Sequence, residues 1–173
     1  IYVNYNSIIP ETSEYVRPRV KIEISSLSMD EPVETRTLRS FISEAVPDAE
    51  DMEIKFKTVI PTRTFLEKIF LLHEEFQKKN PRSYRMSRHL YDIERIMDTS
   101  FGNEALKDLK LYDEIIAHRN IFNHIDGVDY SSHKHDRINF IPPAELIDDW
   151  RNDYNSLEKH FLYSSATHLS FDQ

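Results

Sequence analysis

Hydrophobic and polar residues alternate in the first third of the chain, and this pattern predicts strands. The alternation covers residues 1–7, 20–27 and 52–60, and it is typical of strands that bury one of their two faces. Between the last two segments, residues 36–46 could form a short helix or a turn before Pro47. The side chains expected to face inward are Val20, Ile22, Ile24, Met52, Ile54 and Phe56.

From Pro61 onward the hydrophobic residues recur at helical spacing. Thr64 followed by Glu67 matches a capping box, and the apolar face that follows predicts a helix up to about Lys79. Ser87 is the expected N-cap of a second helix.

The last third of the chain predicts two further helices and a short strand. Residues 104–122 have helical spacing after a break at Gly102-Asn103, 138–141 are a short strand, and Pro142-Pro143 introduces a last helix. The polar tail 164–173 is expected to be mobile. The apolar stripe of the last helix is Leu146, Trp150, Tyr154 or Leu157, and Phe161.

The composition restricts the class of protein. The chain has 173 residues, 39% hydrophobic and 30% charged, which is enough for one sizeable core in a single compact domain. It has no cysteine, which excludes disulfides and thiolate metal sites, and no apolar run of membrane-spanning length. We therefore expect a soluble, cytoplasmic protein without a membrane partner. A net charge of −8 argues against broad, sequence-independent binding of nucleic acids.

Positive charge is concentrated between the first two predicted helices. No acidic residue occurs between Glu75 and Asp92, although five basic residues do: Lys78, Lys79, Arg82, Arg85 and Arg88. Tyr84 lies among them, so the segment could bind RNA phosphates and stack a base. The candidate RNA-binding residues are Lys78, Lys79, Arg82 and Arg85. The segment could equally be a solvated turn, and the sequence leaves both readings open.

Three residues are candidates for chemistry at a site. Lys68, expected in the first turn of a helix, could complete a phosphate pocket with the free backbone N–H groups. Asp92 shares a helix face with Arg88, and Glu23, on the polar face of a predicted strand, is a candidate metal ligand. The alternatives are a solvated lysine, a surface ion pair and an ordinary strand glutamate.

Arg119 and His124 are separated by four residues, a pattern similar to that of the HEPN ribonucleases. The pattern is short, and Arg82 and His89 fit a version with six intervening residues. The histidines between 118 and 135 match no zinc signature. The two glycines of the chain are not placed to form a P-loop or a Rossmann turn.

Four segments together, in order and spacing, give the chain a family resemblance: Tyr15–Ser25, Pro61–Phe70, Ser87–Ile96 and Phe140–Phe161. It resembles the nucleotidyltransferase toxins of bacterial abortive-infection systems, the AbiEii/AbiGii toxin family. The resemblance implies an α+β fold similar to that of polymerase-β-type nucleotidyltransferases. Residues 1–60 would then be the remnant of a mixed sheet, 61–163 a mainly helical region carrying Lys68 and Asp92, and 164–173 a polar tail.

The resemblance also implies transfer of a nucleotide from an NTP to an RNA acceptor such as tRNA, with Mg²⁺ bridging carboxylates and phosphates, and restraint by a cognate antitoxin protein. Lys68 would be catalytic and contact the triphosphate together with Arg88. Asp92 would be catalytic through positioning or proton transfer, and Glu23 would belong to the metal shell. The sequence does not identify the NTP or the acceptor.

The chain departs from the family in one respect. The family's glycine-serine turn with its pair of metal-binding acids precedes the strands, and this sequence contains no Gly-Ser. We therefore expect the 173 residues to be part of a longer enzyme and inactive alone. One alternative is a catalytically dead helical module that binds a partner protein. The other is a HEPN-type ribonuclease using Arg119 and His124, which predicts an all-helical chain.

Overall fold

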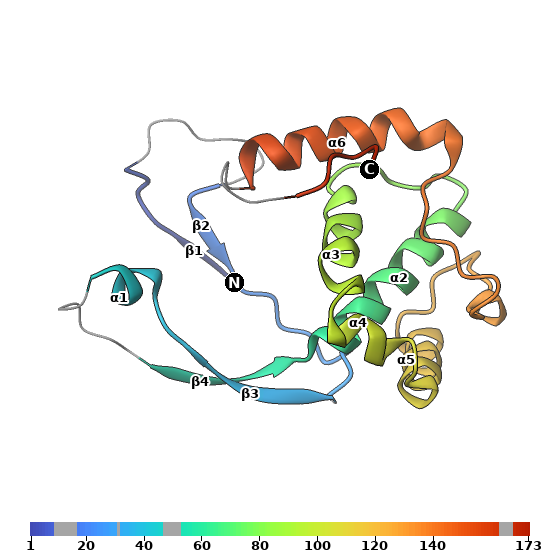
Figure 1. Ribbon diagram of the computed structural model, residues 1–173, viewed down its shortest axis with the longest axis horizontal. Coiled ribbons are helices and arrows are strands. Elements are labelled where there is room, and N and C mark those ends of the chain that lie inside the picture. Colours follow the sequence, from blue (N-terminus) through green and yellow to red (C-terminus); the bar gives the residue numbers. More distant parts are fainter. Residues whose placement is uncertain (9–16, 31, 47–52, 163–167) are drawn as a thin grey trace.

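The computed structural model describes residues 1–8, 17–30, 32–46, 53–162 and 168–173, and it is α+β, with strands on one side and helices on the other (Figure 1). The strands are β1 (Tyr2–Asn4), β2 (Arg19–Lys21), β3 (Val33–Leu38) and β4 (Ile54–Val59), with the short helix α1 (Phe41–Ala45) between the last two. The following helices are α2 (Pro61–Gln77), α3 (Ser87–Met97), α4 (Ser100–Ala105), α5 (Leu109–Phe122), η1 (Tyr130–Ser132), η2 (Ala144–Leu146) and α6 (Ile147–His160).

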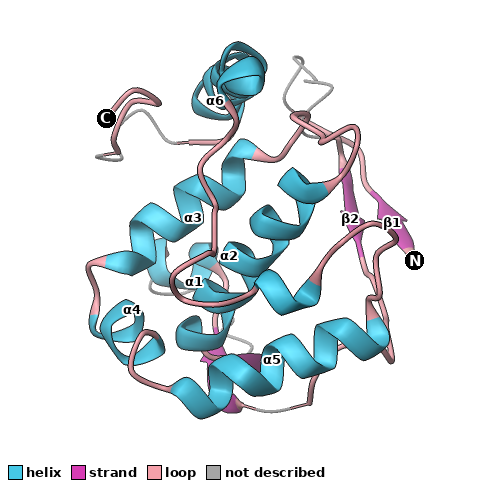
Figure 2. Cartoon of the chain, turned by 90° about the vertical axis from the view of Figure 1, so that its right-hand side faces the viewer, coloured by secondary structure: helices cyan, strands magenta, loops and turns pink. Residues whose placement is uncertain are grey.

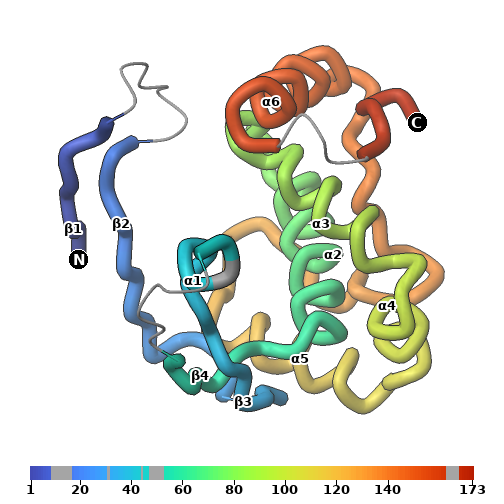
Figure 3. The backbone as a smooth tube through the Cα atoms, turned by 60° about the vertical axis from the view of Figure 1, so that its left-hand side comes forward, coloured from blue at the N-terminus to red at the C-terminus, as the bar shows by residue number. Residues whose placement is uncertain are grey.

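The strands form two separate antiparallel pairs, which Figure 3 shows beside the helices. In one pair Tyr2 lies opposite Lys21, and in the other Val33 lies opposite Val59. The α+β class is thus confirmed, but the described strands do not form one mixed sheet.

The predicted inward face of the strands is wrong. Val20, Ile22 and Ile24 are exposed, as are Ile54 and Phe56, because a two-stranded sheet without a packed layer buries neither face. Met52 lies outside the described residues.

Two strand boundaries also differ from the prediction. The strand expected over 20–27 ends at Lys21, while β3 occupies part of 36–46, where a short helix or turn was expected. Val33, Thr35 and Thr37 of β3 are β-branched and favour extended backbone. Helix α1 follows, and its N-cap Ser40 accepts a hydrogen bond from the backbone N–H of Ser43 at 3.1 Å.

The helical region begins at Pro61, as the change of period predicts. Pro61 occupies the first helical position, where its fixed φ and missing N–H are tolerated. The predicted capping box is wrong, because Thr64 and Glu67 lie inside α2. The Thr64 hydroxyl donates to the Ile60 carbonyl at 3.3 Å, and Glu67 accepts from Arg63 at 2.8 Å.

The helix predicted over 104–122 is two helices. Asp108 caps the second of them, α5, by accepting a hydrogen bond from the Leu111 N–H at 3.0 Å. The predicted break at Gly102 lies inside α4, where a Cβ would approach the Met97 carbonyl oxygen to 2.5 Å. Glycine is therefore needed for close backbone approach, and it does not end the helix.

The residues between α5 and α6 contain no strand within the described part of the chain, so the strand predicted over 138–141 is wrong. The Asn139 N–H donates instead to Nδ1 of His73 at 3.0 Å. Of the predicted α6 stripe, Trp150, Tyr154 and Leu157 are buried, whereas Phe161 is exposed beyond the helix end.

The core lies among the helices, with α3, α4 and α5 packed against α2 and α6 packed against α3 (Figure 2). The described residues with buried side chains all lie between Thr62 and Leu157. The hydrophobic ones from α2 are Phe65, Leu66, Ile69, Phe70 and Leu72, and the opposing helices contribute Ile93, Ala105, Leu111, Tyr112, Ile115 and Trp150.

The end of the chain returns to α6. Tyr154 Oη donates to the Leu169 carbonyl at 2.6 Å, and Arg151 pairs with Asp172 at 2.9 Å. Residues 168–173 are therefore held by contacts, against the expectation of a mobile tail, and 163–167 lie outside the described residues. In the described part of the chain, no helix combines the length and the apolar character that crossing a membrane requires.

Candidate functional site

Lys68 and Asp92 form an ion pair across α2 and α3. Lys68 Nζ lies 2.5 Å from Asp92 Oδ2, and the two side chains are 22% and 38% exposed. The packing of α3 on α2 brings them together. Because α2 begins at Pro61, Lys68 lies well beyond the first turn, so the predicted help from free backbone N–H groups is wrong. The structure thus brings the two predicted catalytic residues into contact.

His89 is the third member of this cluster. Its Nδ1 lies 3.4 Å from Lys68 Nζ, and the side chain is buried. Burial lowers the pKa of His89, and the nearby positive charges of Lys68 and Arg88 lower it further, to about 4. The sequence signal that could have indicated it was its position one helical turn before Asp92.

Arg88 lies beside this cluster, and its charge acts on both His89 and Glu23. Glu23 follows β2, is exposed and pairs with Lys21. The Lys21 hydrogen bond and charge lower the pKa of Glu23, and the charge of Arg88 contributes a smaller part. Arg88 is exposed on α3. Its charge thus acts on the segment after β2 that carries Glu23.

The described residues do not supply a metal site. Within them, no three His, Asp or Glu side chains are grouped so as to hold an ion. Glu23 is therefore a single carboxylate with a lysine partner, and its role as a metal ligand stays a prediction.

The basic loop, residues 78–86 between α2 and α3, is held by a buried carboxylate. Glu75, whose side chain is 1% exposed, accepts from Lys78 Nζ at 2.7 Å and from Arg82 Nη2 at 2.7 Å. It also accepts from the Arg82 backbone N–H at 2.9 Å. Burial would raise the pKa of Glu75, but the hydrogen bonds from Arg82 and Lys78 outweigh it and lower the pKa to about 2.

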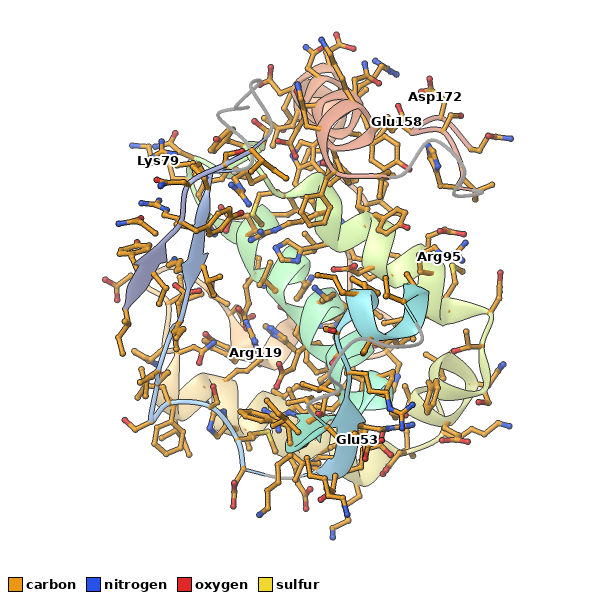
Figure 4. The ribbon with its side chains drawn as sticks, turned by 90° about the vertical axis from the view of Figure 1, so that its left-hand side faces the viewer. Glu53, Lys79, Arg95, Arg119, Glu158 and Asp172 are labelled. Carbon is orange, nitrogen blue, oxygen red and sulfur yellow. The ribbon has the colours of Figure 1, made fainter. Side chains whose placement is uncertain are left out.

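The four predicted RNA-binding residues therefore differ in their surroundings. Lys78 and Arg82 serve as partners of Glu75. Lys79 is exposed at the margin of the molecule, and Arg95 lies at the opposite margin in the same view (Figure 4). Arg85 is half-buried and has a positive φ of 58°.

Asp153 of α6 fixes the end of the basic loop and the start of α3. Its carboxylate accepts from the Arg85 N–H at 2.6 Å, the Ser87 N–H at 3.0 Å and the Ser87 hydroxyl at 2.5 Å. Ser87 is thus the first residue of α3 rather than its N-cap. Sequence reasoning missed Asp153, because no local spacing relates a residue to a helix start 66 positions earlier.

A second polar cluster lies inside the helical region. Glu74 accepts two hydrogen bonds from Arg119, and His133 Nε2 lies 3.5 Å from Glu74 Oε1. Burial would raise the pKa of Glu74, but Arg119 and His133 together lower it. His73 lies beside His133 and shares a hydrogen bond with the Ser132 hydroxyl at 2.9 Å.

The HEPN pattern does not form a site. Arg119, which Figure 4 labels, is buried and pairs with Glu74, whereas His124 is exposed and contacts the Asn120 carbonyl at 3.1 Å. The structure contains strands β2 and β4, whereas the ribonuclease alternative predicts an all-helical chain. The ribonuclease alternative is therefore wrong for this chain.

Two cavities lie away from the Lys68–Asp92 pair. One of about 940 Å³ lies between the residues before α2 and helix α5, and includes Met29, Thr62 and His118 in its lining. Another of about 500 Å³ lies between α3, α6 and the chain end. Neither of these two has Lys68, His89 or Asp92 in its lining.

Comparison with known proteins identifies the family. The family described as nucleotidyl transferase AbiEii toxin, Type IV TA system, matches residues 1–173. No curated protein and no solved structure matches the chain. The family match covers the whole chain, including both the strands and the helices that carry the Lys68–Asp92 pair. The chain therefore belongs to the AbiEii nucleotidyl transferase toxin family of type IV toxin–antitoxin systems, as the resemblance in its sequence predicts.

Proposed function

We propose that the protein transfers a nucleotide from an NTP to an RNA acceptor such as tRNA, and that a cognate antitoxin restrains it. Family membership supports a nucleotidyltransferase toxin with an antitoxin and a nucleotide substrate. The observation that carries the proposal is the 2.5 Å ion pair between Lys68 and Asp92, because it joins a cation suited to phosphate with a carboxylate suited to a hydroxyl.

The pair suggests how substrate engages the site. In the unliganded protein the two charges neutralise each other. An arriving triphosphate competes with Asp92 for the Lys68 ammonium, and Arg88 on the same side adds a second positive charge. Once released, the Asp92 carboxylate can accept the proton of the acceptor hydroxyl. The hydroxyl oxygen then bonds to the α-phosphorus as the bond to pyrophosphate breaks.

Mg²⁺ dependence and a metal role for Glu23 belong to the same proposal. The described residues offer Glu23 alone for this purpose and do not fit a complete ion site, so no step is assigned through the ion. Titration of transfer activity with Mg²⁺, in the wild type and in Glu23→Gln, tests both points. Unchanged Mg²⁺ dependence in the variant removes Glu23 from the metal shell.

The basic loop is the proposed contact for the RNA acceptor. Lys79 is exposed there, and Lys78, Arg82 and Arg85 lie in the same loop. Arg88 is exposed in the first turn of α3, directly after this loop. A local group of cations suits an acceptor whose phosphates are held beside the site, within a chain of net charge −8.

The test is to incubate the protein, expressed as the cell makes it, with each labelled NTP and total tRNA. We expect transfer of label to RNA, and its loss in Lys68→Ala and in Asp92→Ala. The matched controls are Lys110→Ala and Glu114→Ala, which break an exposed ion pair of 3.5 Å on α5. Transfer that persists in either site variant removes that residue from the site.

A helical module that binds a partner protein without catalysis is the second candidate. The observation that favours it is that the described residues offer no group of metal ligands. Transfer of label to RNA by the wild type rejects it. Absence of transfer, with intact toxicity in Lys68→Ala and Asp92→Ala, supports it.

A further inference from the structure

His89 is the second residue of α3, besides Asp92, that contacts the Lys68 ammonium. Lys68 Nζ lies 2.5 Å from Asp92 Oδ2 and 3.4 Å from His89 Nδ1. The ammonium has three protons, so with Asp92 and His89 both as acceptors one proton would remain for a substrate. His89 and Asp92 are one turn apart on that helix, which fixes their separation.

We propose that His89 is a positioning residue: through Nδ1 it accepts a hydrogen bond from Lys68 and keeps the ammonium directed at the site when a substrate phosphate displaces Asp92. This inference rests on the proposed function for its consequence in catalysis. The contact itself does not depend on that function.

The charges around His89 keep the ring able to accept. Lys68 faces it from α2, Arg88 and Asp92 from its own helix, and Arg82 from the basic loop. Only Asp92 among these favours a protonated ring. With burial, the cations hold the pKa of His89 at about 4, so the ring is neutral near pH 7. A neutral ring that accepts at Nδ1 carries its proton on Nε2, whereas a protonated ring has no acceptor.

A neutral acceptor suits this position better than a second carboxylate would. Lysine has a flexible four-carbon stem, so its ammonium needs direction after Asp92 is displaced. A second carboxylate would hold Lys68 by charge and compete with the phosphate. A neutral imidazole nitrogen gives direction without adding negative charge to a site that must receive a polyanion.

The contact can be measured without any enzyme assay. In ¹⁵N spectra of the histidine side chains, we expect His89 to be neutral, with the proton on Nε2 and Nδ1 accepting. In Lys68→Met the Nδ1 resonance should move toward that of an unbonded acceptor, and the pKa of His89 should rise because a nearby cation is gone. A proton on Nδ1, or an Nδ1 resonance unchanged by Lys68→Met, overturns the proposal.

The catalytic consequence is tested by two variants of nearly equal shape, His89→Asn and His89→Leu. Asparagine can place an oxygen acceptor where leucine has a methyl group, while both leave a similar volume in the buried site. We expect the KM for the NTP to rise by about tenfold in His89→Leu, as for a lost hydrogen bond to a charged group. In His89→Asn it should stay within about threefold of the wild type.

Thermal unfolding of both variants separates positioning from folding. Equal KM values in the two variants overturn the positioning role, even if both are less stable than the wild type. If the wild type transfers no nucleotide, the proposed function fails, and the ¹⁵N spectra alone decide whether His89 directs Lys68.

Discussion

Arg119 donates two hydrogen bonds to Glu74 in the interior of the helical region, from Nε at 2.6 Å and from Nη2 at 2.5 Å. The pair joins α5 to α2 across 45 residues of sequence. Both side chains are buried, and Arg119 is the main hydrogen-bond partner of the Glu74 carboxylate. Arg119 is thus a structural residue of the core.

Replacing Arg119 by alanine should destabilise the protein by about 3–5 kcal/mol, because it leaves the Glu74 carboxylate buried without its main partner. Denaturant unfolding measures the loss. His124→Ala is the matched control and should cost at most about 1 kcal/mol, since His124 is exposed and the cost arises from its positive φ of 32°. Loss of toxicity in a well-folded His124→Ala protein would contradict the structural assignment of this pattern.

Acid should weaken the anchor of the basic loop. The pKa of Glu75 is lowered from 4.5 to about 2 in the folded protein. Its contribution is therefore complete above the unfolded pKa of 4.5 and is lost as the pH falls from there to about 2. The contribution is at most about 3 kcal/mol, and solvent around the exposed Arg82 side chain reduces it. Unfolding measured across this pH window should show a shallower slope in Glu75→Gln.

Asp153→Ala should destabilise the first turn of α3. The substitution leaves the Arg85 and Ser87 N–H groups without their acceptor, which should cost about 2–4 kcal/mol. Hydrogen exchange over residues 85–89 should speed up more than exchange in α5. Ser87→Ala removes only the hydroxyl contact and serves as the milder control. Equal exchange in α3 and α5 of Asp153→Ala would contradict a local role.

The Lys68–Asp92 pair should matter little for stability. Both side chains are partly exposed, and such pairs contribute between 0 and about 1 kcal/mol. Lys68→Met and Asp92→Asn should therefore melt close to the wild type while nucleotide transfer is lost. A double-mutant cycle with a coupling above about 2 kcal/mol would indicate a structural pair instead.

Variants of the basic loop should separate RNA contact from loop anchoring. Lys79→Ala should lower the slope of log affinity for RNA against log salt by about 1 if Lys79 contacts a phosphate. Arg82→Ala should change stability as well, because Arg82 is a partner of Glu75. If the salt slope is unchanged in both variants, alone and combined with Arg85→Ala, the loop is a solvated turn that does not contact RNA.

The helices were predictable because their signals are local. Pro61 and the apolar face after it indicate where α2 begins, and the same spacing places Lys68 and Asp92 on adjacent helices. The faces of the strands were not predictable in this way. Alternation assumes that something covers one face, and Ile24 and Phe56 show that nothing in the described structure does.

The remaining errors arise from contacts between distant parts of the chain. Asp153 and Ser87 meet only after α6 has packed on α3, and no periodicity indicates that contact. Gly102 is a similar case at short range. Glycine is needed there because a Cβ would clash with the Met97 carbonyl oxygen, and the spacing of residues does not show that approach. The sequence places His89 one helical turn before Asp92. Its burial and its contact with Lys68, on which the proposed positioning role rests, are visible only in the structure.

Asp153 on α6 lies 66 residues after Ser87, so the start of α3 is fixed late in the synthesis of these residues. A ribosome makes the chain from its N-terminus, so Lys68, His89 and Asp92 exist well before Asp153. An incomplete chain that stops before α6 would contain the ion pair but not the acceptor that fixes the start of α3. We expect such chains to be harmless. Expressing a chain that ends before Ile147 and measuring its toxicity tests this expectation. Activity would then begin only after α6 has been synthesised.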